Sequence, residues 1–196
     1  MVRTVNPESH ARRRATIVAA AAAEFATHGI DGTSTAAICR KAGIGSGTLF
    51  HYFKTKQDIF HAVFADDLPR VTRLCEQALA QPDPDTGLDV LVDHLIGEIA
   101  DPLAPGLASA ASLQANRDPD FARLLTTIDQ EILRTVTTIL RRVEAKPERT
   151  LAFPARSTAR WIQNLIHASH LGIIGGPRAR TAQELRRVVA WLVGRG

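Results

Sequence analysis

The sequence predicts an all-α fold of about nine helices, and three observations support this prediction. Apolar residues recur along the 196-residue chain at the i, i+3, i+4, i+7 spacing of amphipathic helices. Alternating β-branched and aromatic runs bounded by hairpin turns, which indicate strands, are missing. Hydrophobic residues make up 45% of the chain, which is enough to fill a sizeable core.

The first quarter of the chain predicts three helices, at residues 7–29, 34–42 and 46–53. Each has a polar residue at or near its start, as helix N-caps do: Asn6, Thr33 or Ser34, and Ser46. Pro7 suits a first helical position, and Gly29 and Gly43 suit the left-handed residue that ends a helix.

Six more helices are expected in the rest of the chain. The first begins with a capping box, Thr55 with Asp58, and Pro69 is expected to kink or split it. The last begins with a second capping box, Thr181 with Glu184. Periodic apolar residues place the other four at about 88–99, 104–114, 119–143 and 155–174.

Positive charge is concentrated near the N-terminus. Residues 1–56 contain eight Lys and Arg against three Asp and Glu, whereas residues 57–196 contain sixteen against seventeen. This asymmetry predicts two domains, a basic head at 1–56 that binds a polyanion and a near-neutral body at 57–196. A solvated helix face explains the arginines at 12–14 equally well.

Composition also indicates where the chain works. No apolar run reaches the roughly 18 residues of a membrane span, and the first residues lack the apolar segment of a signal peptide. Cys39 and Cys75 form no CxxC pair, so we expect two free, buried thiols. These features predict a cytoplasmic protein that does not interact with membranes.

The stretch AGIGSGTLFHYFKTK, residues 42–56, contains three alternating glycines. A dinucleotide-binding loop needs G-x-G-x-x-G after a strand, and a P-loop needs Gly-Lys-Ser/Thr. Neither pattern is present, and no G-x-S-x-G or HExxH motif suggests an enzyme. A tight turn between two helices in a basic segment explains the glycines better, and this is the arrangement of a helix-turn-helix.

Residues 32–64, GTSTAAICRKAGIGSGTLFHYFKTKQDIFHAVF, resemble the N-terminal domain of TetR-family transcriptional regulators. The resemblance rests on Ile38, on Ala42-Gly43-Ile44 and on Gly47-Thr48-Leu49-Phe50-His51-Tyr52-Phe53, followed by Lys56. It implies a sequence-specific DNA-binding regulator, most often a homodimeric repressor that a small molecule releases from a palindromic operator. It implies no cofactor and no enzymatic activity. The alternative is a helical small-molecule binding protein without specific DNA binding.

The resemblance also implies which residues meet DNA. Its expected DNA contacts are Ser34, Thr35, Ser46, Gly47, Thr48, His51, Tyr52 and Lys56. Leu49, Phe50 and Phe53 are expected to point into the core. Gly45 departs from the family pattern, in which serine is common, so Ser46 is expected to replace it as the helix cap.

In the body, the resemblance implies a dimer seam and an effector pocket. Apolar residues of the last two helices are assigned to the seam: Leu165, Leu171, Ile174, Leu185, Val188, Val189 and Leu192. Polar groups on apolar helices, with two aromatic walls, are assigned to the pocket: His94, Gln114, Asn116, Phe121, Trp161, Asn164 and His167. Pro69 is a candidate hinge. His167 and His170 lie three residues apart on one helix, but no third ligand is evident, so no metal site is expected.

Overall fold

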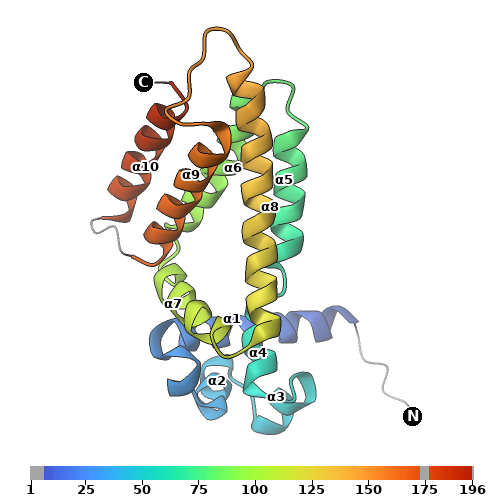
Figure 1. Ribbon diagram of the computed structural model, residues 1–196. Coiled ribbons are helices and arrows are strands. Elements are labelled where there is room, and N and C mark those ends of the chain that lie inside the picture. Colours follow the sequence, from blue (N-terminus) through green and yellow to red (C-terminus); the bar gives the residue numbers. More distant parts are fainter. Residues whose placement is uncertain (1–6, 173–176, 196) are drawn as a thin grey trace.

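The computed structural model describes residues 7–172 and 177–195. Within these ranges the chain is helical, with no strand, and this confirms the predicted fold class (Figure 1). The helices are α1 (Pro7–Gly32), α2 (Thr35–Ala42), α3 (Ser46–Tyr52), α4 (Lys56–Val63), α5 (Asp67–Leu79), α6 (Pro84–Glu98), α7 (Ala104–Ala115), α8 (Pro119–Glu144), α9 (Ala155–His170) and α10 (Arg178–Leu192). No helix of this part of the chain is long and apolar enough to cross a bilayer.

The described residues contain one helix more than the prediction, because the long helix expected after Thr55 is divided into α4 and α5. The predicted capping box is present, since the side chains of Thr55 and Asp58 each bond the other's backbone N–H. The division lies at residues 64–66, upstream of Pro69. Pro69 is the third residue of α5, where a missing N–H breaks no helical hydrogen bond.

Two other boundaries differ from the prediction. α10 begins at Arg178 rather than at a capping box, and Thr181 is a buried residue inside it, so the second capping box is wrong. Glu184 instead pairs with Arg180, one turn earlier on the same helix, at 2.8 Å. The proposed cap Asn6 lies outside the described residues. Gly29 has a left-handed φ of 66° and interrupts α1 where the prediction ended it.

The buried apolar residues form two clusters, one in the head and one in the body. The head cluster joins α1, α2 and α3 to α4, and it also includes residues of α7 and the start of α8, such as Phe121. The body cluster joins α5, α6, α8, α9 and α10. The expected boundary at residue 56 therefore does not follow the packing, because α4 contributes Ile59 and Phe60 to the head.

α8 connects the two clusters along the length of the molecule (Figure 1). Asp118 caps its first turn through two backbone N–H groups, and Pro119 occupies its first position, as the sequence predicted. Its N-terminal turn packs on the head through Phe121, and its later residues Ile132, Val136 and Ile139 are buried in the body. Cys39 and Cys75 are free and buried, one in each cluster.

Candidate functional site

The turn between α2 and α3 has the geometry that the glycines predict. Ser34 caps α2 by accepting a hydrogen bond from the N–H of Ala37 at 3.1 Å. Gly43 ends α2 with φ 65° and ψ 38°, a left-handed conformation that favours glycine. The N–H of Ile44 then bonds the carbonyl of Cys39 at 3.0 Å, which closes the turn. α2, this turn and α3 form a helix-turn-helix.

The start of α3 differs from the expectation for Ser46. Gly45 occupies the N-cap position and provides no side-chain hydrogen bond, so Ser46 is the first helical residue and not the cap. A Cβ added at Gly45 or Gly47 would meet no atom within 4 Å. These two glycines are therefore not required by packing inside this chain. They leave the backbone of the first turn of α3 open to an outside partner.

The eight expected DNA contacts are all exposed or half-exposed residues of the head. Lys56 has an additional role that the sequence did not indicate. Its Nζ donates to the carbonyl of Thr33 at 2.8 Å, which joins the start of α4 to the residue before the cap of α2. Lys56 therefore also helps to hold the helices of the head together.

Aromatic residues surround the C-terminal end of α3. The ring of His10, from α1, lies 4.5 Å from that of Tyr52, and the ring of His51 lies 5.4 Å from it. His10 was not among the expected site residues, because only the fold brings the start of α1 beside α3. Phe50 is 51% exposed, so its assignment to the core is wrong, whereas Leu49 and Phe53 are buried.

A polar cluster centred on Asp118 joins head and body. Its carboxylate accepts from Gln57 of α4 at 3.0 Å and from Gln114 of α7 at 3.3 Å, and lies 2.6 Å from Nε2 of His61. The backbone N–H of Phe121, followed by these side chains, lowers the pKa of Asp118 below its ordinary value of 3.8. The cluster is thus built around an ionised carboxylate.

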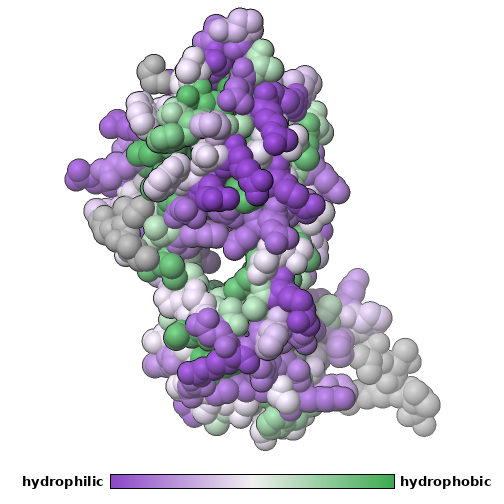
Figure 2. Space-filling view, in the orientation of Figure 1, coloured by the Kyte–Doolittle hydropathy of each residue, from purple (hydrophilic) through white to green (hydrophobic). Residues whose placement is uncertain are grey.

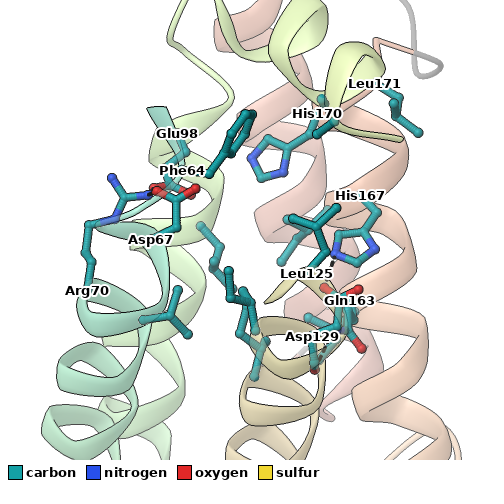
Figure 3. A pocket seen from close by; sticks show the side chains of 18 of the residues that line it. Phe64, Asp67, Arg70, Glu98, Leu125, Asp129, Gln163, His167, His170 and Leu171 are labelled. Atoms are coloured by element: carbon teal, nitrogen blue, oxygen red, sulfur yellow. Dashed lines mark hydrogen bonds and ion pairs between the residues drawn. The ribbon is translucent and has the colours of Figure 1, made fainter. Parts of the chain in front are cut away.

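A cavity of about 300 Å³ lies in the body next to the head (Figure 3). Figure 2 shows the molecular surface hollowed where body and head meet. Most of the lining is apolar and comes from helices α5 to α9, with Phe64 at the end of α4. Its main polar groups are Asp67, Arg70, Glu98, Asp129, Gln163, His167 and His170. Mostly apolar walls with a few polar groups are typical of small-molecule sites.

Of the seven expected pocket residues, His167 lines this cavity, where it pairs with Asp129 at 3.1 Å. Phe121 is buried in the head cluster, Gln114 is buried where it bonds Asp118, and His94 lies beside Glu98. The other three are exposed on helix surfaces: Asn116, Trp161 and Asn164. These six were chosen as isolated polar or aromatic groups. In the folded chain they lie on sides of their helices that do not line the cavity.

The sequence analysis missed the charged lining residues, although a signal for them was present. Glu98 follows Leu91 and Leu95 on the apolar stripe of α6, and Asp129 follows Leu125 by one turn of α8. A charge on a buried stripe indicates a polar group facing an internal space. Within the described residues, no group of three His, Cys, Asp or Glu could hold a metal ion.

The assigned dimer seam is divided between core and surface. Leu185, Val189 and Leu192 are buried in the body cluster of this chain, so they are not available to a partner. Leu165 is half-buried against the same cluster, Leu171 is partly exposed, and Ile174 lies outside the described residues. Val188 is 41% exposed, and the two tryptophans Trp161 and Trp191 are exposed by 52% and 62%.

Comparison with known proteins gives consistent results. The family model for bacterial regulatory proteins of the tetR family matches residues 17–63. The HTH-type transcriptional regulator UidR of Escherichia coli is 25% identical over 189 residues, or 92% of each chain. The HTH-type transcriptional repressor KstR2 of Mycolicibacterium smegmatis is 34% identical over 86 residues, or 42% of each chain.

Solved structures share the whole fold. A TetR-family regulator from Agrobacterium tumefaciens superposes with a TM-score of 0.75 at 20% identity, covering 96% of this chain and all of that one (100%). GusR of Salmonella enterica superposes with a TM-score of 0.65 at 23% identity, covering 97% and 98%.

Proposed function

Because the chain belongs to the tetR family of bacterial regulatory proteins and is a DNA-binding transcriptional regulator, we propose that it is a homodimeric repressor released from a palindromic operator by a small molecule. Proteins of this family are transcription regulators and not enzymes. A regulator of chromosomal genes works beside the chromosome, so a cytoplasmic location belongs to the same proposal.

The observation that carries DNA recognition is the open first turn of α3, presented by the left-handed turn at Gly43 on a basic head. α3 enters the major groove, with Thr48, His51 and Tyr52 facing base edges or phosphates. Ser34 and Thr35 donate hydrogen bonds to phosphates at the start of α2. The domain division follows this role, with a DNA-binding head and an effector-binding body.

Selection of bound fragments from the genome of the source organism tests this proposal. We expect purified protein in about 150 mM salt to recover a short palindrome, with affinity that falls steeply as salt rises. Tyr52→Ala is expected to weaken binding, whereas Arg141→Ala, at an exposed site near the C-terminal end of α8, is expected to leave it unchanged. Recovery of random sequence alone would contradict the proposal.

Dimerisation is proposed through the exposed face of α9 and α10. Trp161, Val188 and Trp191 present apolar surface there, and large exposed aromatic groups are typical of protein interfaces. We expect Trp191→Glu to convert a dimer into monomers in sedimentation experiments. Leu113→Glu changes an equally exposed side chain on α7 and is expected to leave the dimer intact. A wild-type monomer would refute this proposal.

Release requires the cavity to influence the head, and Phe64 supplies a contact between them. Its ring lines the cavity and also packs against Phe60 and Phe121 at 5.1 and 5.2 Å. Phe60 in turn packs against Phe25 of α1 at 5.1 Å. An effector that moves Phe64 therefore shifts α4 and α1. This lowers the population of dimers whose two heads are spaced to enter successive major grooves, and the protein leaves the operator.

The second candidate function is a helical small-molecule binding protein that does not bind a specific DNA sequence. The cavity favours it as much as it favours an effector-controlled repressor. The fragment selection separates the two, because saturable ligand binding without a recovered palindrome would support the second.

A further inference from the structure

We propose that the effector is an amphiphilic amine, a largely apolar molecule whose protonated nitrogen binds at the cavity end formed by Asp67, Glu98 and His170. This inference rests on the proposed function, since it names the chemical class of the effector. It follows from the charges of the lining, from how each charged group is already paired, and from one buried nitrogen that has no partner.

The lining contains more negative charge than positive charge. It has three carboxylates, Asp67, Glu98 and Asp129, and one guanidinium, that of Arg70. The remaining ionisable lining groups are histidines. An anionic effector would add a fourth negative charge to this space, whereas a cation would reduce the repulsion.

The guanidinium of Arg70 is already occupied. Its Nη2 lies 2.9 Å from the carboxylate of Asp67 and 2.9 Å from that of Glu98 (Figure 3). Binding a carboxylate or phosphate effector there would compete with both existing pairs. Arg70 is therefore a poor anion receptor and serves to hold the two acids side by side.

Even with Arg70 present, this end of the cavity lacks positive charge. The pKa of Asp67 is raised to about 6, mainly by burial, while Arg70 lowers it and Glu98 and Asp66 raise it further. An ammonium group beside Asp67 would stabilise the ionised form and relieve this cost.

His170 favours an effector that carries a hydrogen-bond donor. Its Nε2 atom is buried and has no hydrogen-bond partner in the part of the chain that the structure describes. Burial lowers the pKa of His170, so the ring is neutral near pH 7. A neutral imidazole has one donor nitrogen and one acceptor nitrogen, and in this proposal Nε2 has the acceptor role. A protonated primary amine can donate to it, and a quaternary ammonium cannot.

The effector nitrogen is proposed to lie among these three groups, which line the same cavity. The charge of Glu98 influences the pKa values of both Asp67 and His170. Figure 3 shows Asp67 and His170 extending toward the same part of the cavity from α5 and α9, beside Phe64. The apolar lining beyond them, including Val71, Leu95 and Ile132, accommodates a hydrocarbon group.

The test is calorimetric titration of the free protein with four probes of one chain length: decylamine, decan-1-ol, decanoate and decyltrimethylammonium. We expect decylamine to bind at least roughly tenfold more tightly than each of the others at pH 7.5, as a hydrogen bond to a charged group implies. Lowering the pH to 5 protonates Asp67 and is expected to weaken decylamine binding about tenfold.

Variants locate the effect. Asp67→Asn is expected to abolish the preference for decylamine over decan-1-ol, while Glu76→Gln, on the exposed face of the same helix, retains it. His170→Leu is expected to weaken decylamine without weakening decyltrimethylammonium. Circular dichroism tests whether each variant is folded. If a variant does not fold, the comparison of the four probes on the wild-type protein tests the proposal without it.

Several results would overturn the inference. The inference fails if decan-1-ol or decanoate binds as tightly as decylamine, or if no probe binds. It also fails if Asp67→Asn keeps the preference for decylamine over decan-1-ol. The fragment selection uses protein without effector, so the proposed function can succeed where this inference fails, and the reverse also holds.

Discussion

Replacing Gly106 with alanine tests the packing of α7 on α1, which joins body to head. A Cβ at Gly106 would lie 2.6 Å from the carbonyl carbon and 2.8 Å from the Cα of Ala26, and it would overlap the carbonyl oxygen. Carbon atoms in contact prefer separations of about 3.5–4.0 Å, so the two helices would have to move apart by about 1 Å. All of these atoms belong to backbone, so no side-chain rotation relieves the overlap.

Overpacking of this kind costs about 1–3 kcal/mol, and rigid backbone on both sides places Gly106→Ala near 3 kcal/mol. For a chain of this length, that lowers the melting temperature by roughly 6–12 °C. We also expect weaker operator binding at temperatures where the variant is folded, because α1 is displaced within the head.

The control is Gly97→Ala in α6, where an added Cβ would meet no atom within 4 Å. Alanine there is expected to stabilise the protein by about 0.5–1 kcal/mol, because glycine is the poorer helix former. Thermal unfolding followed by far-ultraviolet circular dichroism measures both variants. A Gly106→Ala protein that melts at or above the wild-type temperature would show that α7 does not approach α1 so closely.

Three further predictions concern charged groups. Asp118 has a lowered pKa, so its stabilising contribution is present above pH 4 and is lost as the pH falls below that value. The difference in free energy of unfolding between wild type and Asp118→Ala should therefore be smaller at pH 3 than at pH 7. Asp67 has a pKa raised to about 6, so the folded protein loses stability as the pH rises from 4 through 6. The free energy of unfolding of Asp67→Asn should therefore exceed that of wild type by about 1–3 kcal/mol at pH 7.5 and equal it near pH 3.5. Urea titrations at the two pH values measure this difference. Lys56→Ala should lower both operator affinity and unfolding temperature, since it loses the bond to the carbonyl of Thr33, whereas Lys54→Ala, at an exposed site, should not change the unfolding temperature; equal melting of both variants would exclude the structural role of Lys56.

Local features were predictable because each depends on a few neighbouring residues. Ser34 caps α2 and Gly43 ends it through contacts within four residues, so short patterns carried that information. Gly45 was misjudged by one position, because either it or Ser46 allows a helix to begin and only the backbone geometry distinguishes them.

The pocket was largely unpredictable from the chain order. Asp67, Glu98 and His170 belong to three helices that are far apart in sequence and become neighbours only through packing. The apolar stripe of α6 marks Glu98 alone, and no local pattern links it to Asp67 and His170.

The sequence by itself determined the helical class, the helix-turn-helix and the basic character of the head, because periodicity, caps and charge are properties of contiguous residues. The tertiary structure decided which apolar residues are core and which are surface. On α10, Val189 is buried and its neighbour Val188 is exposed, although both are valine. A helix has several faces, and only the arrangement of the other helices around it determines which face loses its contact with water.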